Sequence, residues 1–325
     1  KAMLIKKICL LGGTGFVGQT LANRLSTAGY ELKVLSRKRE SSRKNLILLP
    51  KLELIETDIH SQTNLENHFN DCDAVINLVG ILNESGRNGT GFHYAHVELV
   101  EKMIKACHKN GVRRVLQMSA LNADASNGPS HYLRSKGEAE KILFADADLQ
   151  VSCFRPSVIF GANDSFFNRF ALLLKMTPLV FPLACPQARF APVYVDNVAT
   201  AFLKSLDDPH SFGKYYCLCG PKSYSLQELV EYTASCLKIR RRIIPLTDSL
   251  SRLQASVFDF VPGKPFSTDN YQSTIVDSIC ESNDLQKLGI TAQALEAVVP
   301  QYLSQQKQRT RYQEYRRHSH RPSNL

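Results

Sequence analysis

Tyr132 and Lys136 are the pair of residues whose types and spacing point most directly to chemistry. They stand four positions apart in a stretch that we expect to be helical, so both side chains should lie on one face and reach a common ligand. A phenol with a pKa of about 10 exchanges protons poorly at neutral pH, and a neighbouring ammonium group stabilises the phenolate and draws that pKa down. Tyr132 is therefore a candidate general acid and base, with Lys136 as its partner.

Ser119 is the third candidate catalytic residue. It follows residues 112–118, which we expect to be a strand, and open α/β sheets bind ligands at the carboxyl ends of their strands. Its hydroxyl could hold a substrate carbonyl. Each of the three residues also has an ordinary structural explanation, because Tyr and Lys often fall four apart by chance and Ser is common in turns. Their place downstream of a cofactor motif favours the catalytic interpretation.

The cofactor motif is the glycine-rich stretch at residues 12–18, which follows the apolar residues 8–11 and leads into a helical pattern. Glycines at this spacing allow a tight turn, the close approach of a pyrophosphate to backbone N–H groups, and close packing of helix on strand. The alternative is an incidental glycine-rich turn. We predict a dinucleotide site here, formed by Gly12, Thr14, Gly15, Phe16, Val17 and Gly18.

The residues after the second expected strand, 31–35, indicate which dinucleotide binds. An acidic residue there would bind the ribose 2′-hydroxyl of NAD, but the chain has Ser36, Arg37, Lys38 and Arg39. Arginine and lysine suit the 2′-phosphate of NADP. We therefore favour NADP(H), with Arg37 and Lys38 as contacts, over NAD(H), and a solvated basic loop is the structural alternative.

Charge and hydropathy exclude several classes of protein. About half of the net charge of +10 lies in residues 304–325, a basic tail that is poor in aliphatic residues and that we expect to be disordered. Without a basic face on the core, we do not expect nucleic-acid binding. The most apolar segment, residues 170–192, is interrupted by Lys175 and three prolines, so it does not form a membrane span. We expect no signal peptide.

The nine cysteines are scattered, and several lie in apolar, strand-like runs. They are typical of buried small hydrophobic residues. The close pair Cys217 and Cys219 lacks the spacing of metal ligands, so we expect neither a metal site nor a disulfide. The pattern favours a reducing, cytoplasmic setting, and peripheral contact with the inner membrane stays open.

Strand and helix patterns alternate from the N-terminus, which predicts an α/β fold with a Rossmann-type, doubly wound parallel sheet. We expect strands at residues 7–11, 31–35, 52–56, 74–78, 112–118 and 150–155, and helices at 15–28, 93–110 and 130–147.

We divide the chain into a dinucleotide-binding domain (residues 1–160), a smaller substrate lobe (161–303) and the tail (304–325). In the second part we expect a helix at 196–206 that returns to the sheet. The other expected lobe elements are a strand at 214–218, a helix opened by the capping-box pair Ser225 and Glu228, a strand at 242–245 and a helix at 250–260.

Over residues 4–300 the chain resembles the extended and atypical branches of the short-chain dehydrogenase/reductase superfamily. The motifs that carry the resemblance are residues 12–18, Thr57-Asp58-Ile59, Asn77-Leu78-Val79-Gly80, Ser119, Tyr132 with Lys136, residues 155–161 and residues 193–199. The resemblance implies that Tyr132 is the general acid and base, that Ser119 assists it at the substrate oxygen, and that Lys136 bonds the nicotinamide ribose.

The same resemblance implies the remaining cofactor contacts. Asp58 would bond the adenine amino group, and Ile59 beside it would also contact the cofactor. The loop at 77–80, with Leu78, Val79 and Gly80, would line the adenosine side, and the backbone of Pro156 to Val158 would flank the nicotinamide. For Asp58 the alternative is a helix N-cap before Leu65.

A narrower likeness joins residues 155–170 and 261–271 to bacterial relatives of the short-chain-dehydrogenase-like accessory subunit of respiratory complex I. That family's mitochondrial member is regarded as holding a nucleotide structurally, which makes NADP(H) binding the firmer expectation and catalysis the less firm one.

Two functions follow as hypotheses. The first is an NADP(H)-dependent oxidoreductase that moves hydride to or from the carbonyl or alcohol of a lipophilic compound, quinone-pathway, isoprenoid or sterol-like. The second is a non-catalytic NADP(H)-binding accessory protein that docks onto a larger complex or a membrane surface. A nucleotide-sugar epimerase or dehydratase is a less favoured variant. A lipophilic substrate is suggested by apolar residues that could equally be lobe packing: Phe166, Phe167, Phe170, Leu172, Leu173, Leu179, Val180 and Phe181.

Overall fold

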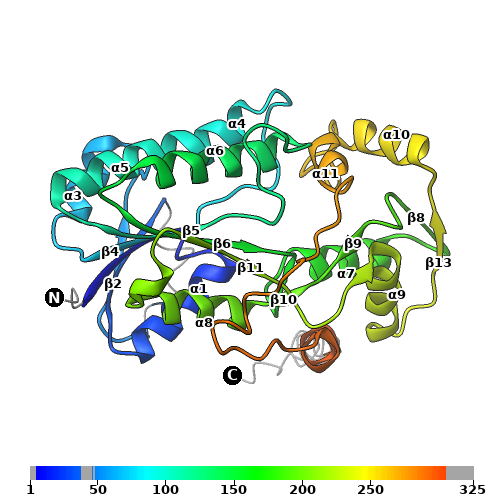
Figure 1. The fold of residues 1–325 in the computed structure, drawn as a ribbon. Helices are drawn as coiled ribbons and strands as arrows, with labels where there is room; N and C mark the ends of the chain where they lie inside the picture. The colour runs from blue at the N-terminus through cyan, green and yellow to red at the C-terminus, as the bar shows by residue number, and fades with distance from the viewer. Residues whose placement is uncertain (1–4, 38–45, 47, 305–325) are drawn as a thin grey trace, which may run out of the picture.

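A parallel sheet of seven strands forms the centre of the larger part of the molecule, in the order β11-β6-β5-β4-β1-β2-β3 (Figure 1). The computed structural model describes residues 5–37, 46 and 48–304. Every neighbouring pair of strands in this sheet runs parallel. The strands are β1 (Lys7–Leu11), β2 (Glu31–Ser36), β3 (Leu52–Glu56), β4 (Ala74–Asn77), β5 (Arg114–Met118), β6 (Gln150–Pro156) and β11 (Lys214–Leu218).

Helices cover both faces of this sheet. On one face α1 (Phe16–Thr27) and α8 (Val195–Leu206) pack against apolar residues of β1, β2, β4, β5 and β6. On the other face lie α3 (Gln62–Phe69), α5 (Leu99–Asn110) and α6 (His131–Ala145), above a second core cluster. The short helix α4 (Thr90–His93) and a π-helical turn, Tyr94–Glu98, lead into α5. The strand order reverses between β1 and β4, and open α/β sheets bind ligands at the carboxyl edge of such a switch point.

The smaller lobe lies beside the carboxyl ends of the strands and is built from short strand pairs and helices (Figure 1). Its helices α7 (Phe166–Met176) and α9 (Leu226–Cys236) enclose an apolar core together with residues 295–304, which are also helical. The helices α10 (Asp248–Phe258) and α11 (Thr268–Ser273) follow β13. The strands are β7 (Ile159–Phe160), β8 (Val180–Leu183), β9 (Arg189–Phe190), β10 (Val193–Tyr194), β12 (Tyr224–Ser225) and β13 (Arg242–Pro245). The short 3-10 helix Pro209–Ser211 precedes β11.

Most of the expected elements are confirmed, including all six strands of the first 160 residues and the helix at residues 196–206 that returns to the sheet. The capping box is formed as predicted, because Ser225 Oγ accepts from Glu228 N and the Glu228 carboxylate accepts from Ser225 N. One assignment is wrong: the strand at 214–218 belongs to the central sheet, beside β6, and not to the lobe. Packing determines this place, since Leu218 is fully buried and the Tyr216 ring stacks on Phe154.

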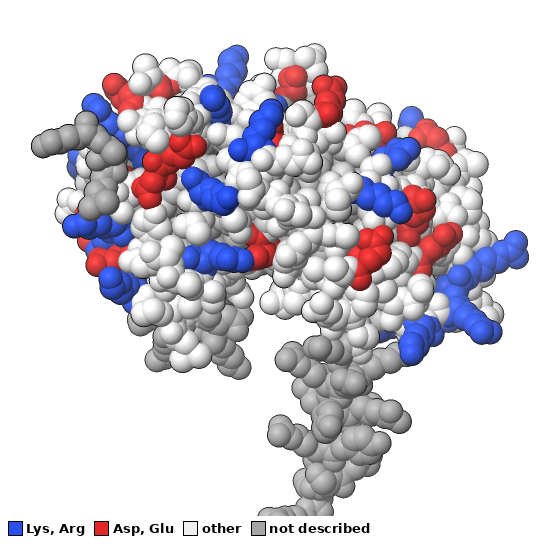
Figure 2. Space-filling model, turned by 60° about the horizontal axis from the view of Figure 1, so that its bottom comes forward, with Lys and Arg blue, Asp and Glu red and all other residues white. Residues whose placement is uncertain are grey.

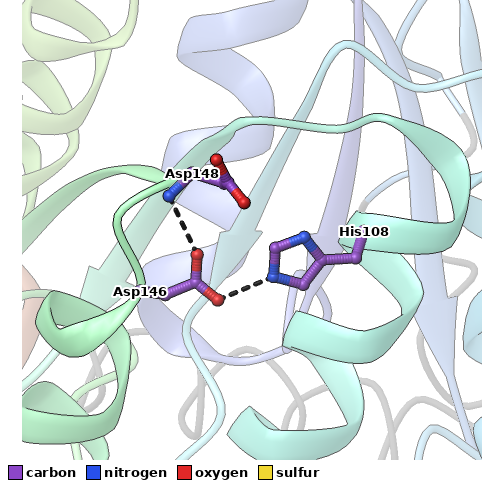
Figure 3. A group of neighbouring side chains, drawn as sticks. All are labelled: His108, Asp146 and Asp148. Carbon is purple, nitrogen blue, oxygen red and sulfur yellow. Dashed lines mark hydrogen bonds and ion pairs between the residues drawn. The ribbon is translucent and has the colours of Figure 1, made fainter.

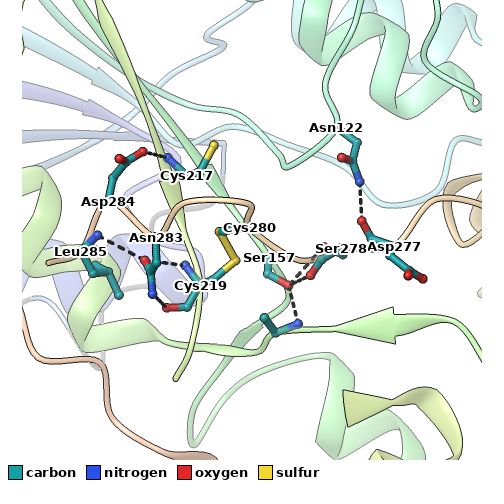
Figure 4. The surroundings of a disulfide bond; sticks show 11 residues. Asn122, Ser157, Cys217, Cys219, Asp277, Ser278, Cys280, Asn283, Asp284 and Leu285 are labelled. Carbon is teal, nitrogen blue, oxygen red and sulfur yellow. Dashed lines mark hydrogen bonds between the residues drawn. A yellow bond between two sulfur atoms is a disulfide. The ribbon is translucent and has the colours of Figure 1, made fainter. Parts of the chain in front are cut away.

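Cys219 and Cys280 form a disulfide, although we expected none (Figure 4). The two residues are 61 positions apart, so no local spacing reveals the pair. Around the disulfide, Asp284 and Asn283 bond the backbone of Cys217 and Cys219 and cover the outer edge of β11. The disulfide removes the argument from cysteine usage for a reducing setting, because disulfides persist in oxidising compartments.

Candidate functional site

The glycine-rich turn between β1 and α1 has the geometry of an anion site. Gly12 has a positive φ of 78°, and a Cβ at Gly18 would stand 2.3 Å from Gly12 O, so the turn needs glycine at both positions. Gly15 N donates to Gly12 O at 3.0 Å, and among the described residues no side chain caps α1. The first turn of α1 therefore presents backbone N–H groups and the positive end of its dipole.

Lys136 lies at the junction of the strand ends that border this turn. Its Nζ donates to the carbonyl oxygens of Val79 at 3.1 Å and Met118 at 3.2 Å. Val79 lies just after β4, and Met118 is the last residue of β5. A Cβ added at Gly80 would stand 3.2 Å from Nζ, so the backbone passes close to the ammonium group. The loop after β4 also reaches the glycine turn, because a Cβ at Gly12 would lie 3.1 Å from Val79 N. Leu78, Val79, Gly80 and Lys136 are thus brought together beside Gly12.

Burial lowers the pKa of Lys136 to about 8, and nearby Glu140 partly opposes this shift. Glu140 itself makes a bidentate ion pair with Arg155, whose guanidinium lies over the Tyr215 ring. The ammonium of Lys136 therefore has no carboxylate hydrogen-bonded to it within the described residues and is held by two carbonyl oxygens. Such a cation is ready to donate to the hydroxyl groups of a ligand.

Tyr132 is positioned by a residue from the lobe that the sequence did not reveal. Asp269 of α11 accepts from His131 N at 2.7 Å and from Tyr132 N at 3.3 Å, and Ser130 Oγ accepts from Leu133 N at 3.1 Å. These acceptors satisfy the first N–H groups of α6, as N-capping requires. Because Asp269 is 137 positions from Tyr132, no spacing rule could have found it.

The prediction that Lys136 lowers the pKa of Tyr132 is wrong. Burial, followed by the charge of Asp269, raises the pKa of Tyr132 to about 12. Lys136 is one helical turn away, but its ammonium group is directed to the carbonyls of Val79 and Met118. Tyr132 is therefore protonated at neutral pH and can donate a proton or a hydrogen bond.

His96, which the sequence analysis missed, joins three parts of the site. Its Nε2 accepts from Ile81 N at 3.2 Å, so its Nδ1 carries the proton and donates to Ser135 Oγ at 2.8 Å. Ser135 Oγ in turn donates to Tyr132 O. Burial and the charge of Lys136 lower the pKa of His96 to about 2, which agrees with this neutral form. The π-helical turn at Tyr94–Glu98 places the ring, and such turns are frequent at functional sites.

Ser119 is buried directly after β5, as expected, and its N–H donates to Phe154 O at 2.7 Å. Its Oγ is buried and has no hydrogen-bond partner among the described residues. A buried hydroxyl without a partner costs free energy, and such groups are often functional. Two residues later, Leu121 N donates to Pro156 O at 3.1 Å, which connects the Ser119 loop to the end of β6.

The residues expected at the adenosine end follow β2 and β3. Thr57 N donates to Ser36 O at 2.9 Å, so the ends of β2 and β3 are hydrogen-bonded to each other. Arg37 and Asp58, which come just after these ends, are both exposed. Asp58 accepts from His60 N at 2.9 Å and does not cap α3; Ser61 does, by accepting from Asn64 N. The N-cap interpretation of Asp58 is thus wrong. Ile59 is buried in the core, and Lys38 lies outside the described residues.

The nicotinamide end is expected around Pro156 and Val158. Val158 O accepts from Val193 N at 2.9 Å, and Ser157 Oγ donates to Ser278 O at 2.6 Å, so residues of both parts of the molecule fix this loop. Gly161 brings the loop to the glycine turn, because a Cβ there would lie 3.1 Å from the Phe16 ring. Val17, in the first turn of α1, is partly buried against the apolar core.

The aromatic residues proposed to line a lipophilic pocket instead pack within the lobe. Phe167 and Phe181 are buried, and the rings of Phe166 and Phe170 contact them or one another. By contrast Leu172, Leu179 and Val180 are exposed. The packing alternative therefore accounts for the aromatic residues of this segment.

A group of three potential metal ligands, His108, Asp146 and Asp148, occurs in the described part of the chain (Figure 3). His108 Nε2 and Asp146 Oδ2 are 2.7 Å apart, and Asp148 N donates to Asp146 at 3.1 Å. The group lies just before β6, hence at the edge of the sheet opposite Ser119 and Lys136. It takes no part in the site. Among the described helices, none combines the length and apolar character needed to cross a bilayer.

Comparison with known proteins adds to this geometry. The sequence model of the family described as "NAD dependent epimerase/dehydratase family" matches residues 8–218. An Arabidopsis thaliana protein named NADH dehydrogenase [ubiquinone] 1 alpha subcomplex subunit 9, mitochondrial, is 27% identical over 312 residues, which cover 91% of this chain and 77% of that protein. Ceramide reductase of Caulobacter vibrioides is 23% identical over 241 residues, 74% of each chain.

Among solved structures, a dTDP-glucose 4,6-dehydratase from Streptomyces venezuelae with NAD and TYD bound superposes with a TM-score of 0.71. The two sequences are 17% identical, and the match covers 93% of this chain and 97% of the dehydratase. At this identity the likeness shows the fold, a Rossmann-type sheet with a smaller lobe.

Proposed function

Since the chain belongs to the NAD dependent epimerase/dehydratase family, we propose that it is an NADP(H)-dependent oxidoreductase in which Tyr132 transfers the proton that accompanies hydride transfer. Membership in this family supports a dinucleotide cofactor, and we further propose that this cofactor is NADP(H) rather than NAD(H). The observation that carries the oxidoreductase proposal is that three groups lie along the carboxyl ends of the strands. They are the first turn of α1, which has no side-chain cap among the described residues, the Lys136 ammonium group, and the Ser119 hydroxyl, which has no described hydrogen-bond partner.

The residues fit a dinucleotide along the carboxyl edge of the sheet. The pyrophosphate would sit at the first turn of α1, and the nicotinamide ribose would take hydrogen bonds from Lys136. Arg37 would meet the 2′-phosphate of NADP, and Asp58 the adenine. When bound, the cofactor supplies or accepts the hydride.

The chain's own residues would then handle the substrate oxygen and its proton. Tyr132, protonated at neutral pH because burial raises its pKa to about 12, would donate to a carbonyl that is being reduced. Ser119 would hold the same oxygen by donating its unpartnered hydroxyl. Lys136 would act as a ribose ligand, because its ammonium group is held by the carbonyls of Val79 and Met118 and does not lower the pKa of the phenol. In the direction of alcohol oxidation the same groups act in reverse.

We propose a lipophilic carbonyl or alcohol as substrate. The aromatic residues of α7 no longer support this proposal, because they pack within the lobe. The relative named ceramide reductase supports a lipophilic class, whereas the dehydratase with the same fold keeps nucleotide sugars as an alternative.

A second proposal is a non-catalytic, nucleotide-binding accessory protein. It is favoured by the relatives named NADH dehydrogenase [ubiquinone] 1 alpha subcomplex subunit 9, mitochondrial, of which two are 27% and 28% identical over 91% and 88% of this chain. In that case the same site would bind a dinucleotide as a structural element.

Two measurements separate these proposals. Binding of NADPH and NADH to the purified protein is measured first, and we expect NADPH to bind roughly ten- to a hundredfold more tightly. NADPH oxidation is then followed with lipophilic ketones and quinones, and UDP- and dTDP-sugars are tested in parallel. Turnover of a lipophilic compound supports the oxidoreductase, and tight binding without turnover of any compound supports the accessory protein. Failure to bind either nucleotide would contradict both.

A further inference from the structure

The end of the lobe that carries β8 and β13 exposes apolar side chains where the rules of folding would place polar ones. In β8, Phe181 and Leu183 face the core, yet the outward residue Val180 is also apolar and is 40% exposed. Its partner strand exposes Ile244, at 39%. A strand pair with one buried face is expected to alternate apolar and polar residues. This pair does not.

The end of α7 continues the same exposed apolar surface. Leu172 and Met176, one turn apart, are 56% and 69% exposed. The next turn carries Leu179, which is 80% exposed and has a positive φ of 57°. A leucine in the left-handed region is strained, so the turn holds this side chain outward at a cost in free energy. Arg242 N donates to Leu179 O, which places β13 directly beside it.

Lys and Arg side chains lie around this surface, and the two chain segments that form it contain no carboxylate side chain. Residues 166–183 and 237–247 contain six Lys and Arg residues and no Asp or Glu. Arg241 is used structurally, because its Nε donates to Thr177 O at 2.7 Å at the end of α7. Lys238, Arg240 and Arg242 are exposed. Figure 2 shows Lys and Arg side chains projecting together from the lobe end of the molecule, at the lower right.

We propose that this surface, which we call the lobe-end surface and define by Met176, Leu179, Val180, Ile244, Lys238, Arg240 and Arg242, docks onto an anionic lipid bilayer. Apolar side chains that enter the headgroup region and cations that meet anionic lipid are the two terms that hold peripheral proteins on membranes. The inference is independent of the cofactor site.

The other exposed apolar stripe of the lobe does not share this character. On α10 the exposed residues Leu250, Leu253 and Val257 lie beside an Asp248–Arg252 ion pair, so that helix has charges of both signs. Of these two described surfaces, the lobe-end surface alone combines exposed apolar side chains with charge of one sign. Docking onto a protein partner would not require such an excess of positive charge on this surface.

The test is binding of the full chain to vesicles of phosphatidylcholine alone and of phosphatidylcholine with phosphatidylglycerol. We expect binding to the anionic vesicles that weakens as salt is raised. Each cation near an anionic surface changes affinity roughly fivefold, so Arg240→Gln with Arg242→Gln should weaken binding roughly thirtyfold. Met176→Ser with Leu179→Ser should weaken it at least tenfold.

Matched controls separate the effect of this surface from the effect of net charge. Lys105→Gln with Lys141→Gln removes the same charge from exposed sites on α5 and α6 and should leave binding within about twofold. Arg240→Lys with Arg242→Lys keeps the charge and should also keep binding. Thermal melting of each variant checks that the fold is intact.

Three results would overturn the proposal. Equal affinity for both vesicle types would show that charge does not contribute to binding. Equal losses of affinity in the test and control variants would show that the contact lies elsewhere on the protein. Failure of the wild type to bind any vesicle would exclude lipid and leave this surface to a protein partner.

Discussion

The charge of Lys136 gives a pH dependence that can be worked out from the structure. Burial lowers the pKa of this lysine to about 8. A lowered lysine pKa means that the ammonium form is present below about pH 8 and is lost as the pH rises through that value. If the ammonium binds the nicotinamide ribose, dinucleotide affinity must fall over the same range.

The magnitude follows from the fraction of charged Lys136. At pH 7 roughly nine in ten molecules carry the charge, and at pH 9 roughly one in ten, so the dissociation constant should rise roughly tenfold, or about 1.4 kcal/mol. Tyr132→Phe should show the same rise, because the pKa of Tyr132 lies at about 12, above this range.

The assay is calorimetric or fluorescence titration of NADPH from pH 7 to pH 9.5 at constant ionic strength. Lys136→Arg keeps its charge throughout and Lys136→Met has none, so both variants should give a flat profile, each after a melting curve has confirmed folding. A flat profile in the wild type, or the same slope in Lys136→Met, would refute the assignment of Lys136 to the ribose.

Three further predictions concern the cofactor turn, the choice of dinucleotide and the disulfide. Gly18→Ala places a Cβ 2.3 Å from Gly12 O and should abolish nucleotide binding, which titration measures. Arg37→Ala should bring the affinities for NADPH and NADH within about threefold of each other; an unchanged NADPH preference would contradict the contact. Cys280→Ser should lower the free energy of unfolding by about 2–4 kcal/mol, and thiol titration of the unreduced, denatured wild type should find seven thiols rather than nine.

The sheet could be predicted because each of its strands carries its own local signal. Residues 7–11 and 52–56 are strands with the expected bounds, and the glycine turn after β1 is where its spacing placed it. The expected helix end at residue 110 is also confirmed, because α5 ends there and its C-cap, Gly111, has a φ of 69°. These features depend on a few neighbouring residues.

The parts that could not be predicted depend on contacts between distant residues. Whether the strand at 214–218 joins the central sheet is decided by packing on Phe154 and by the cover from Asp284, and neither is local. The Cys219–Cys280 disulfide has the same character. In the site, the pairing of Tyr132 with Lys136 was predicted from their spacing. The pKa of Tyr132 was not, because burial and then Asp269, which reaches α6 from the lobe, raise it, opposite to the expected direction.

The proposed oxidoreductase requires Tyr132 to supply the proton in a reaction at a bound nicotinamide. The most direct test compares the wild type, Tyr132→Phe and the matched control Tyr215→Phe in single-turnover oxidation of NADPH. The carbonyl substrate is one identified among the lipophilic ketones and quinones tested above. Tyr132→Phe should bind NADPH within a few-fold of the wild type and lose roughly 10²–10⁴ in rate, while Tyr215→Phe, altered at an exposed ring, should keep its rate. An undiminished rate in Tyr132→Phe would contradict the mechanism, and NADPH bound without turnover in all three proteins would favour the accessory role.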